Sequence, residues 1–170
     1  MKYISRSIKL ALVCAFAAGA AFAQSGSFSD PSVEFSFDIP DDRWKMTVKP
    51  AESNGSVEFV FVDRNDGHFT VRKATASPNT PLGDVIREEE QKLQFMRGFV
   101  AGKEENFRGK LSGSVYNFEY VERGRPKSGR FYFLRSGSTV YILRFTGYRD
   151  KLRSIQHFTD SIARTFDVTA

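Results

Sequence analysis

The sequence is poor in cysteine and histidine. Its 170 residues contain one cysteine, Cys14, and two histidines, His68 and His157. Without a pair of cysteines the chain forms no internal disulfide, so its stability must come from a hydrophobic core. The two histidines are far apart in the sequence and have no convergent set of catalytic or metal-binding neighbours. We therefore predict no catalytic site, no cofactor and no metal centre.

The sequence also lacks an apolar run long enough to cross a bilayer, which takes about 20 residues. The best candidate, Leu10 to Ala18, precedes the small-x-small pattern of residues 21–23. Three cations come before it: Lys2, Arg6 and Lys9. This pattern predicts a signal peptide over residues 1–23, cut between Ala23 and Gln24, and a secreted or periplasmic protein. Lipidation of Cys14 is the minor alternative, because valine rather than a small residue precedes it.

A strong excess of charge is missing as well. The sequence has 25 Lys and Arg against 20 Asp and Glu, and three of the cations belong to the predicted leader. The remaining formal charge of +2 is too small for the basic face that nucleic acid requires. The 147 residues after the cut suit one domain. We expect residues 24–31, rich in Ser and Gly, to be a flexible lead-in and 32–170 to form that single domain.

Recognisable catalytic motifs are absent too. There is no G-x-S-x-G elbow, no P-loop and no dinucleotide glycine pattern. Residues 63–68 resemble a calcium loop, but Gly67 stands in the fifth place and no closing glutamate follows. A hairpin turn at Asn65-Asp66-Gly67 is the better interpretation. The run Glu88 to Glu90 cannot point inward together on a helix, and we expect it to face mostly solvent.

Strand patterns dominate what is present. Residues 33–39 alternate apolar and polar, and after Trp44, an expected core residue, 45–48 suits a return strand. Residues 57–62 and 69–74 predict a hairpin. The central feature is a meander of three aromatic strands with two glycine-bearing turns. Its strands cover residues 114–123, 130–136 and 139–145.

Two helices complete the predicted fold. Thr80 can cap a helix that begins at Pro81 and ends near Gly98, and Asp150 can cap a second one that ends near Phe166. A weak strand is expected around 105–110. The sum is an α+β domain in which an antiparallel sheet of about six or seven strands is flanked by helices. Apolar residues on both sides of the last meander strands indicate cover on both faces, or one face left for a partner.

One basic stretch stands out as a candidate interaction surface. Residues 123–130 lie at the first turn of the meander and are flanked by two tyrosines. The candidate residues are Arg123, Arg125, Lys127, Arg130, Tyr120 and Tyr132. Arginine forks and aromatic rings suit an acidic protein or an anionic surface. Simple solubilisation of a long hairpin is the alternative explanation.

The order of features resembles the PsbP-like domain, which shares its fold with the Ran-binding Mog protein. The resemblance is carried by 35–40 followed by Trp44, the helix opened at Thr80-Pro81, the strand end at 141–143, and the helix closing on 162–166. It implies an α/β/α sandwich, usually without enzymatic activity, that serves as an extracytoplasmic binding or assembly module. The metal and protein contacts of photosynthetic members have no matching positions here.

Two functional hypotheses follow. The first is a non-enzymatic binding module with a protein partner in the cell envelope. The second is a small-ligand protein that binds a lipid or an aromatic metabolite on an aromatic sheet face. The identity of the partner and the oligomeric state have no signal in the sequence.

Overall fold

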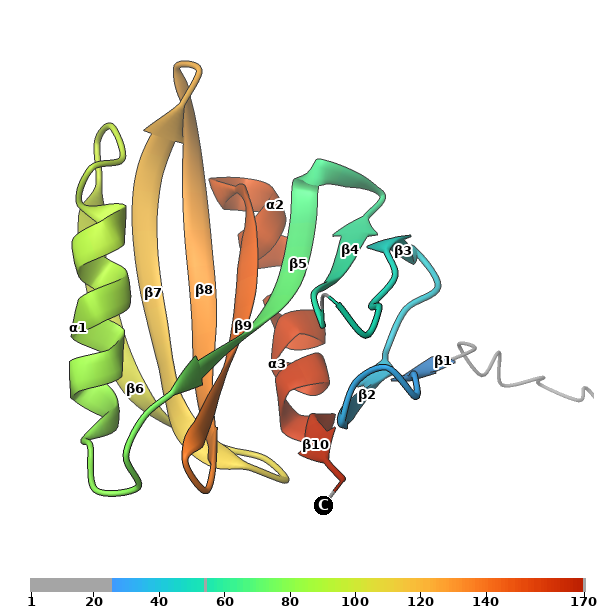
Figure 1. The fold of residues 1–170 in the computed structure, drawn as a ribbon. Helices are drawn as coiled ribbons and strands as arrows, with labels where there is room; N and C mark the ends of the chain where they lie inside the picture. Colours follow the sequence, from blue (N-terminus) through green and yellow to red (C-terminus); the bar gives the residue numbers. More distant parts are fainter. Residues whose placement is uncertain (1–25, 54, 170) are drawn as a thin grey trace, which may run out of the picture.

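The structure, a computed structural model, describes residues 26–53 and 55–169. These residues form an α+β sandwich with a large antiparallel sheet in the middle (Figure 1). The predicted leader and its cleavage position lie outside the described residues. Within the described ranges, no helix has the length and apolar character needed to cross a membrane.

The large sheet contains seven strands in the order β3-β4-β5-β9-β8-β7-β6. Their bounds are β3 Trp44–Val48, β4 Val57–Phe61, β5 Asp63–Thr75, β6 Val100–Arg108, β7 Ser112–Glu122, β8 Arg125–Ser136 and β9 Thr139–Tyr148. A second sheet has the order β1-β2-β10, with β1 Gly26–Ser29, β2 Phe35–Ile39 and β10 Asp167–Val168. The helices are α1 Leu82–Leu93, α2 Arg149–Ser154 and α3 Gln156–Thr165.

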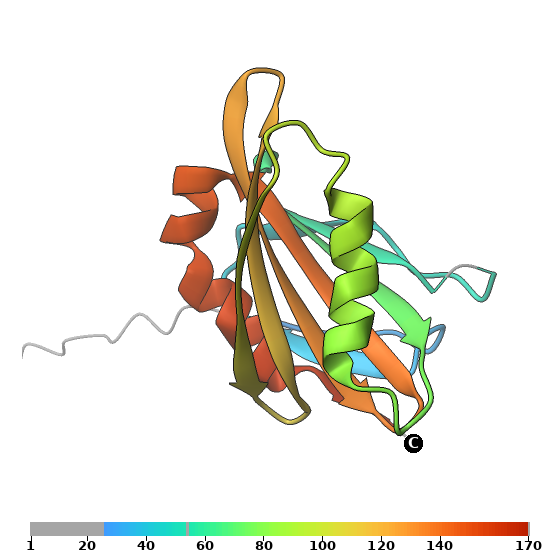
Figure 2. The same cartoon turned by 90° about the vertical axis from the view of Figure 1, so that its left-hand side faces the viewer.

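Helix α1 covers one face of the large sheet (Figure 2). Its residues Val85, Ile86 and Leu93 pack on rings from β7 and β8, including Phe118 and Phe131. The helix forms because apolar residues recur at helical spacing, and burial of this stripe stabilises it. Cover by α1 explains why one side of the meander is aromatic.

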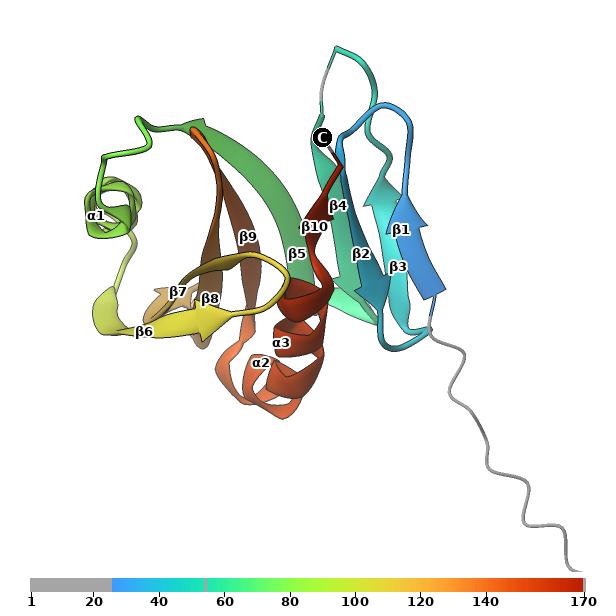
Figure 3. The same cartoon turned by 90° about the horizontal axis from the view of Figure 1, so that it is seen from below.

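Helices α2 and α3, together with the small sheet, cover the other face (Figure 3). Here Phe69 and Phe145 stack with ring centroids 4.4 Å apart, and Trp44 lies at the edge of the same group. Trp44 is 4 % exposed, so its prediction as a core residue is confirmed. The aromatic residues of both faces of the meander are therefore covered, and within the described residues no aromatic sheet face is left open for the small-ligand hypothesis.

The predicted flexible lead-in is wrong where the structure describes it. Residues Gly26–Ser29 form β1 and pair with β2, and Phe28 is 4 % exposed. Phe28 stacks on Phe37 with centroids 4.8 Å apart. Burial of this single aromatic ring holds the segment on the core, although its other residues are small and polar.

The turn between β4 and β5 also differs from the prediction. Asn65, Asp66 and Gly67 belong to β5, and the chain reverses at Val62, which has a φ of 62°. Gly67 is closely packed, because a Cβ there would lie 2.8 Å from the Cδ1 of Ile155 and 3.0 Å from the Cβ of Phe61. The glycine signal was real, but its cause is a close approach of α2–α3 rather than a turn.

The helices differ in three details. Pro81 occupies the N-cap of α1 without a side-chain hydrogen bond, so Thr80 does not cap it. Glu89 is 5 % exposed rather than outward, and it pairs with Lys92 at 2.6 Å. The predicted last helix is divided at Ile155, where the backbone leaves the helical region with a φ of −105°.

Candidate functional site

The basic stretch forms the end of the β7–β8 hairpin, which projects beyond the rest of the sheet (Figure 1). Only Arg123 and Gly124 make the turn, with φ values of 51° and 77°, and Glu122 pairs with Arg125 across it. Two positive φ values are typical of the two-residue turn that follows the twist of an antiparallel hairpin. The rest of the stretch belongs to β8, so the exposed part is shorter than predicted.

The structure divides the predicted interaction residues into two groups. Arg123 and Arg125 are exposed at the hairpin end. Tyr120 and Tyr132 are 6 % and 0 % exposed and point to opposite faces of the sheet. Burial raises the pKa of Tyr120 to about 12. The two tyrosines therefore belong to the core and do not flank an aromatic surface around the turn.

Lys127 and Arg125 hold the hairpin against the end of β9. Lys127 is 8 % exposed, forms an ion pair with Glu122, and lies with its Nζ 5.5 Å from the ring centre of Tyr148. The hydrogen bond from Lys127 lowers the pKa of the Glu122 carboxyl. Nη1 of Arg125 donates to the hydroxyl of Tyr148 at 3.1 Å. These contacts fix the direction in which the hairpin projects.

Arg130 lies away from the turn, in a polar network between β8 and α3. Its Nη2 donates to Asp160 Oδ1 at 2.8 Å, its Nη1 to Asn117 Oδ1 at 2.7 Å and its Nε to the Tyr132 hydroxyl at 2.7 Å. Oγ1 of Thr159 lies 2.8 Å from the same hydroxyl. Burial is the main cause of the raised pKa of Tyr132, and this tyrosine donates to Asp160.

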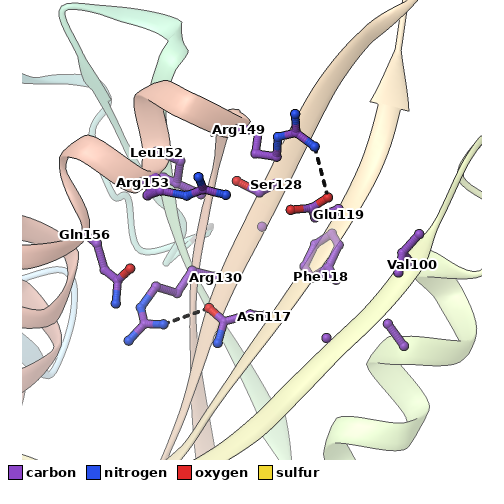
Figure 4. Close-up of a pocket in the computed structure, with 13 residues that line it drawn as sticks. Val100, Asn117, Phe118, Glu119, Ser128, Arg130, Arg149, Leu152, Arg153 and Gln156 are labelled. Carbon is purple, nitrogen blue, oxygen red and sulfur yellow. Dashed lines mark hydrogen bonds and ion pairs between the residues drawn. The ribbon is translucent and has the colours of Figure 1, made fainter.

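Beside this network the sheet is hollowed. A cleft of about 300 Å³ lies where β6, β7 and β8 face α2 and the start of α3 (Figure 4). We call it the arginine cleft. Its polar lining consists of Arg130, Arg149, Arg153, Asn117, Glu119, Ser128 and Gln156. Sequence reasoning missed it because these residues come from four elements, and only their i, i+2 alternation on β7 and β8 signals a polar sheet face.

The cleft carries more positive than negative charge. Arg149 and Arg153 reach it from α2, while Arg130 reaches it from β8 (Figure 4). Glu119 is the one carboxylate in its lining, and its Oε2 lies 3.5 Å from Nη1 of Arg149. A concave site with cations and low-dielectric walls attracts anions.

A hydrophobic residue adjoins the hairpin on its other side. Phe95, just after α1, is 93 % exposed, and Arg97 follows it in the same loop. The loop is fixed to the hairpin by the bond from the N–H of Val121 to the carbonyl of Arg97, at 2.8 Å. We use the name hairpin end for this surface: Phe95, Arg97, Arg123 and Arg125.

The histidines do not form part of either feature. Nε2 of His68 on β5 lies 3.1 Å from Glu58 Oε2, and burial lowers the pKa of this histidine. His157 is exposed on α3 against the ring of Phe158. Among the described residues, no group of three or more His, Cys, Asp or Glu side chains is placed to hold a metal ion.

Comparison with known proteins identifies the fold. No family model matches the sequence, and no curated protein matches it significantly. The Ran-binding protein Mog1p of Saccharomyces cerevisiae superposes with a TM-score of 0.62 and 9 % identity, over 86 % of this chain and 96 % of that one. The cyanobacterial PsbP (CyanoP) of Synechocystis gives 0.55 and 17 %, over 88 % and 95 %.

Two further structures have the same fold. LpqN of Mycobacterium tuberculosis, described as involved in cell envelope biogenesis, gives a TM-score of 0.55 and 15 % identity, over 86 % of this chain and 92 % of that one. A protein from Bacteroides thetaiotaomicron gives 0.58 and 18 % over 86 % of this chain, but this chain spans 49 % of it. The chain thus has the fold of PsbP and Mog1p, as the resemblance in the sequence predicted.

Proposed function

We propose that this protein is a non-enzymatic binding or assembly module of the cell envelope, and that it docks a protein partner through the hairpin end. The fold supports a binding role, because Mog1p is a Ran-binding protein and LpqN is involved in cell envelope biogenesis. The leader pattern of residues 1–23 supports the compartment.

The observation that carries the proposal is the combination of charge and exposure at the hairpin end. Phe95 is 93 % exposed, so nearly all of its ring is available to be buried by a partner surface. Arg97 and Arg123 make no salt bridge in the described part of the chain. An exposed apolar ring and two arginines without an ion pair, carried by a loop and a hairpin that are bonded to each other, suit an acidic partner surface with an apolar pocket.

The rigidity of the hairpin end adds to this argument. The bond between Val121 and Arg97 fixes the loop that carries Phe95, and the contact of Arg125 with Tyr148 fixes the hairpin. A surface that is already ordered loses little conformational entropy on binding. The surface therefore has the properties of a pre-organised docking site.

Site-specific crosslinking in the producing cells tests the proposal. A photoreactive amino acid at position 95 should give a discrete crosslinked product that weakens with rising salt, since the contact is partly electrostatic. Arg123→Glu with Arg125→Glu should abolish the product. The control pair Lys45→Glu and Arg87→Glu changes the charge equally at exposed positions elsewhere and should preserve it. Loss with both pairs, or with neither, contradicts the proposal.

The non-enzymatic part is tested separately. The purified protein should not turn over a broad panel of hydrolase substrates. Turnover that disappears in His68→Ala or His157→Ala would show a catalytic role for those histidines and would overturn this part of the proposal.

A further inference from the structure

The arginine cleft contains donors that the fold itself does not use. Arg130 carries five N–H groups. Its bonds to Asp160 and Asn117 occupy one hydrogen on each terminal nitrogen, which leaves one more hydrogen on Nη1 and one on Nη2. Because the side chain is only 11 % exposed and is held at three nitrogens, these N–H groups have a fixed direction. Arginine N–H groups whose direction is fixed in advance suit a carboxylate or phosphate acceptor.

Two further arginines complete the charge of the cleft. Arg153 is exposed on α2 and makes no salt bridge in the described residues. Arg149 is held only loosely, at 3.5 Å from Glu119 and 3.9 Å from Asp150, and both of these acids are largely solvated. Long, exposed ion pairs contribute little and are readily exchanged for a better acceptor. Both arginines are therefore available to an incoming anion.

The other residues that line the cleft indicate what kind of molecule carries the anionic group. Ser128 and Gln156 add polar groups, whereas Val100 and Ala101 of β6 form an apolar wall on the side of the cleft opposite Leu152 of α2 (Figure 4). Val100 is 60 % exposed, so it has apolar surface still to be covered. A volume of about 300 Å³ lies at the lower end of ligand sites, which fits a small molecule rather than a protein segment.

We infer that the arginine cleft binds the oxyanion of a small molecule, a phosphate or carboxylate group carried on a short apolar chain. The oxyanion lies between Arg130, Arg149 and Arg153, and the chain lies on Val100 and Ala101. Arg130 is the pre-organised donor, and the arginines of α2 complete the enclosure. This site is separate from the hairpin end and does not depend on the proposed docking of a protein.

Titrations followed by amide NMR at constant ionic strength test the inference. The probes are inorganic phosphate, butyl phosphate and butyrate, with chloride as the anion that lacks the oxyanion geometry. We expect saturable shifts at the backbone of Gly102, Ser128 and Arg153, strongest for one of the two butyl compounds. A stronger response to butyl phosphate identifies a phosphate site, and a stronger response to butyrate identifies a carboxylate site. Either compound should bind more tightly than inorganic phosphate, because only the chain contacts the apolar wall.

Variants connect the shifts to the cleft. Arg149→Gln and Arg153→Gln should each weaken binding about tenfold, as expected for loss of one charge-assisted hydrogen bond. The control Arg87→Gln, an exposed arginine on α1, should leave the affinity unchanged. The inference is overturned if the shifts do not approach saturation with any oxyanion by roughly 20 mM, because the affinity is then negligible. It is also overturned if the control variant weakens binding as much as the cleft variants do.

The outcome can be separated from that of the proposed function. Arg123→Glu with Arg125→Glu should abolish crosslinking at position 95 but leave oxyanion binding intact, because neither residue lines the cleft. If crosslinking at position 95 fails and the titration succeeds, the cleft stands as a ligand site without the docking surface. If the titration fails while crosslinking succeeds, only the inference about the cleft is lost.

Discussion

The two faces of the large sheet consist of alternate residues of the same strands, yet they differ at the β6 side. Under α1, strand β7 presents only aromatic rings: Tyr116, Phe118 and Tyr120. On the opposite face β7 begins with buried Val115 and continues with half-buried Asn117 and Glu119. Strand β8 changes in the same way, from Leu134 and Tyr132 to Arg130 and Ser128.

This difference shows that the polarity of a strand residue depends on whether a helix covers it. A polar side chain under full cover is costly unless it is hydrogen-bonded, so an uninterrupted apolar face requires a helix along its whole length. Where α2 and α3 stop covering the sheet, β7 and β8 carry polar residues and the arginine cleft opens. The change of residue type along one face of one strand thus locates the cleft.

The largest expected effect tests whether both faces are sealed. Phe133→Ala under α1 and Phe145→Ala under α2 and α3 should each lower the free energy of unfolding by about 3–5 kcal/mol, because both rings are fully buried. Phe95→Ala should change it by less than about 0.5 kcal/mol. Urea denaturation measures all three. A loss below about 1 kcal/mol at Phe145 would mean that this face is not closed.

A smaller effect distinguishes the buried arginines of the two faces. Arg130→Met should destabilise the fold by about 2–3 kcal/mol, since it removes the cation that pairs with Asp160 and one of the hydrogen bonds of the Tyr132 hydroxyl. Arg144 lies under α1 with its Nε unpaired in the described residues, and burial lowers its pKa. Arg144→Met should therefore cost less than about 1 kcal/mol. Equal losses in thermal unfolding would contradict the contrast.

High pH should weaken the α1 face. Burial raises the pKa of Tyr116 and Tyr120 from 10.0 to about 12, so each keeps its proton in the fold after the unfolded chain has lost it. The free energy of unfolding should fall between pH 10 and 12. Each tyrosine contributes at most about 1.4 kcal/mol per pH unit, because it can lose only one proton. Tyr120→Phe should reduce the slope in urea denaturation, and an unchanged slope would exclude its contribution.

The smallest effect concerns the cleft itself. Arg149→Gln combined with Arg153→Gln should shift the free energy of unfolding by no more than about 0.5 kcal/mol, because the ion pairs of Arg149 are long and solvated and Arg153 makes none in the described residues. Calorimetry provides the measurement. A loss above about 2 kcal/mol would assign these arginines to the stability of the fold and remove the basis for a ligand role.

Much of the fold could be predicted from local patterns. The meander, the strand from Val57, the helix after Pro81 and the buried Trp44 all follow from apolar periodicity and turn residues. These patterns act over neighbouring residues, and the local chain therefore contains the information. The PsbP-like arrangement followed from their order along the chain.

The errors arose where distant segments decide the outcome. Gly67 is a glycine because Ile155 approaches it, and Phe28 orders its segment because Phe37 is there to stack on. The candidate surface was overextended for the same reason. Arg130 is the same residue type as Arg123 and Arg125 near the turn. Its ion pair with Asp160 on α3 nevertheless places its side chain in the interior.

Strand β2 lies between β1 and β10, so residues 26–29 and residues 167–168 pair with the same central strand. Phe166, which is fully buried, stacks on Phe35 of that strand with centroids 5.3 Å apart. The small sheet therefore depends on contacts between segments that are far apart in the sequence, and it can be complete only after β10 has paired with β2. Because loop closure over so long a stretch is slow, we expect the small sheet to form late in folding, after the local hairpins of the large sheet.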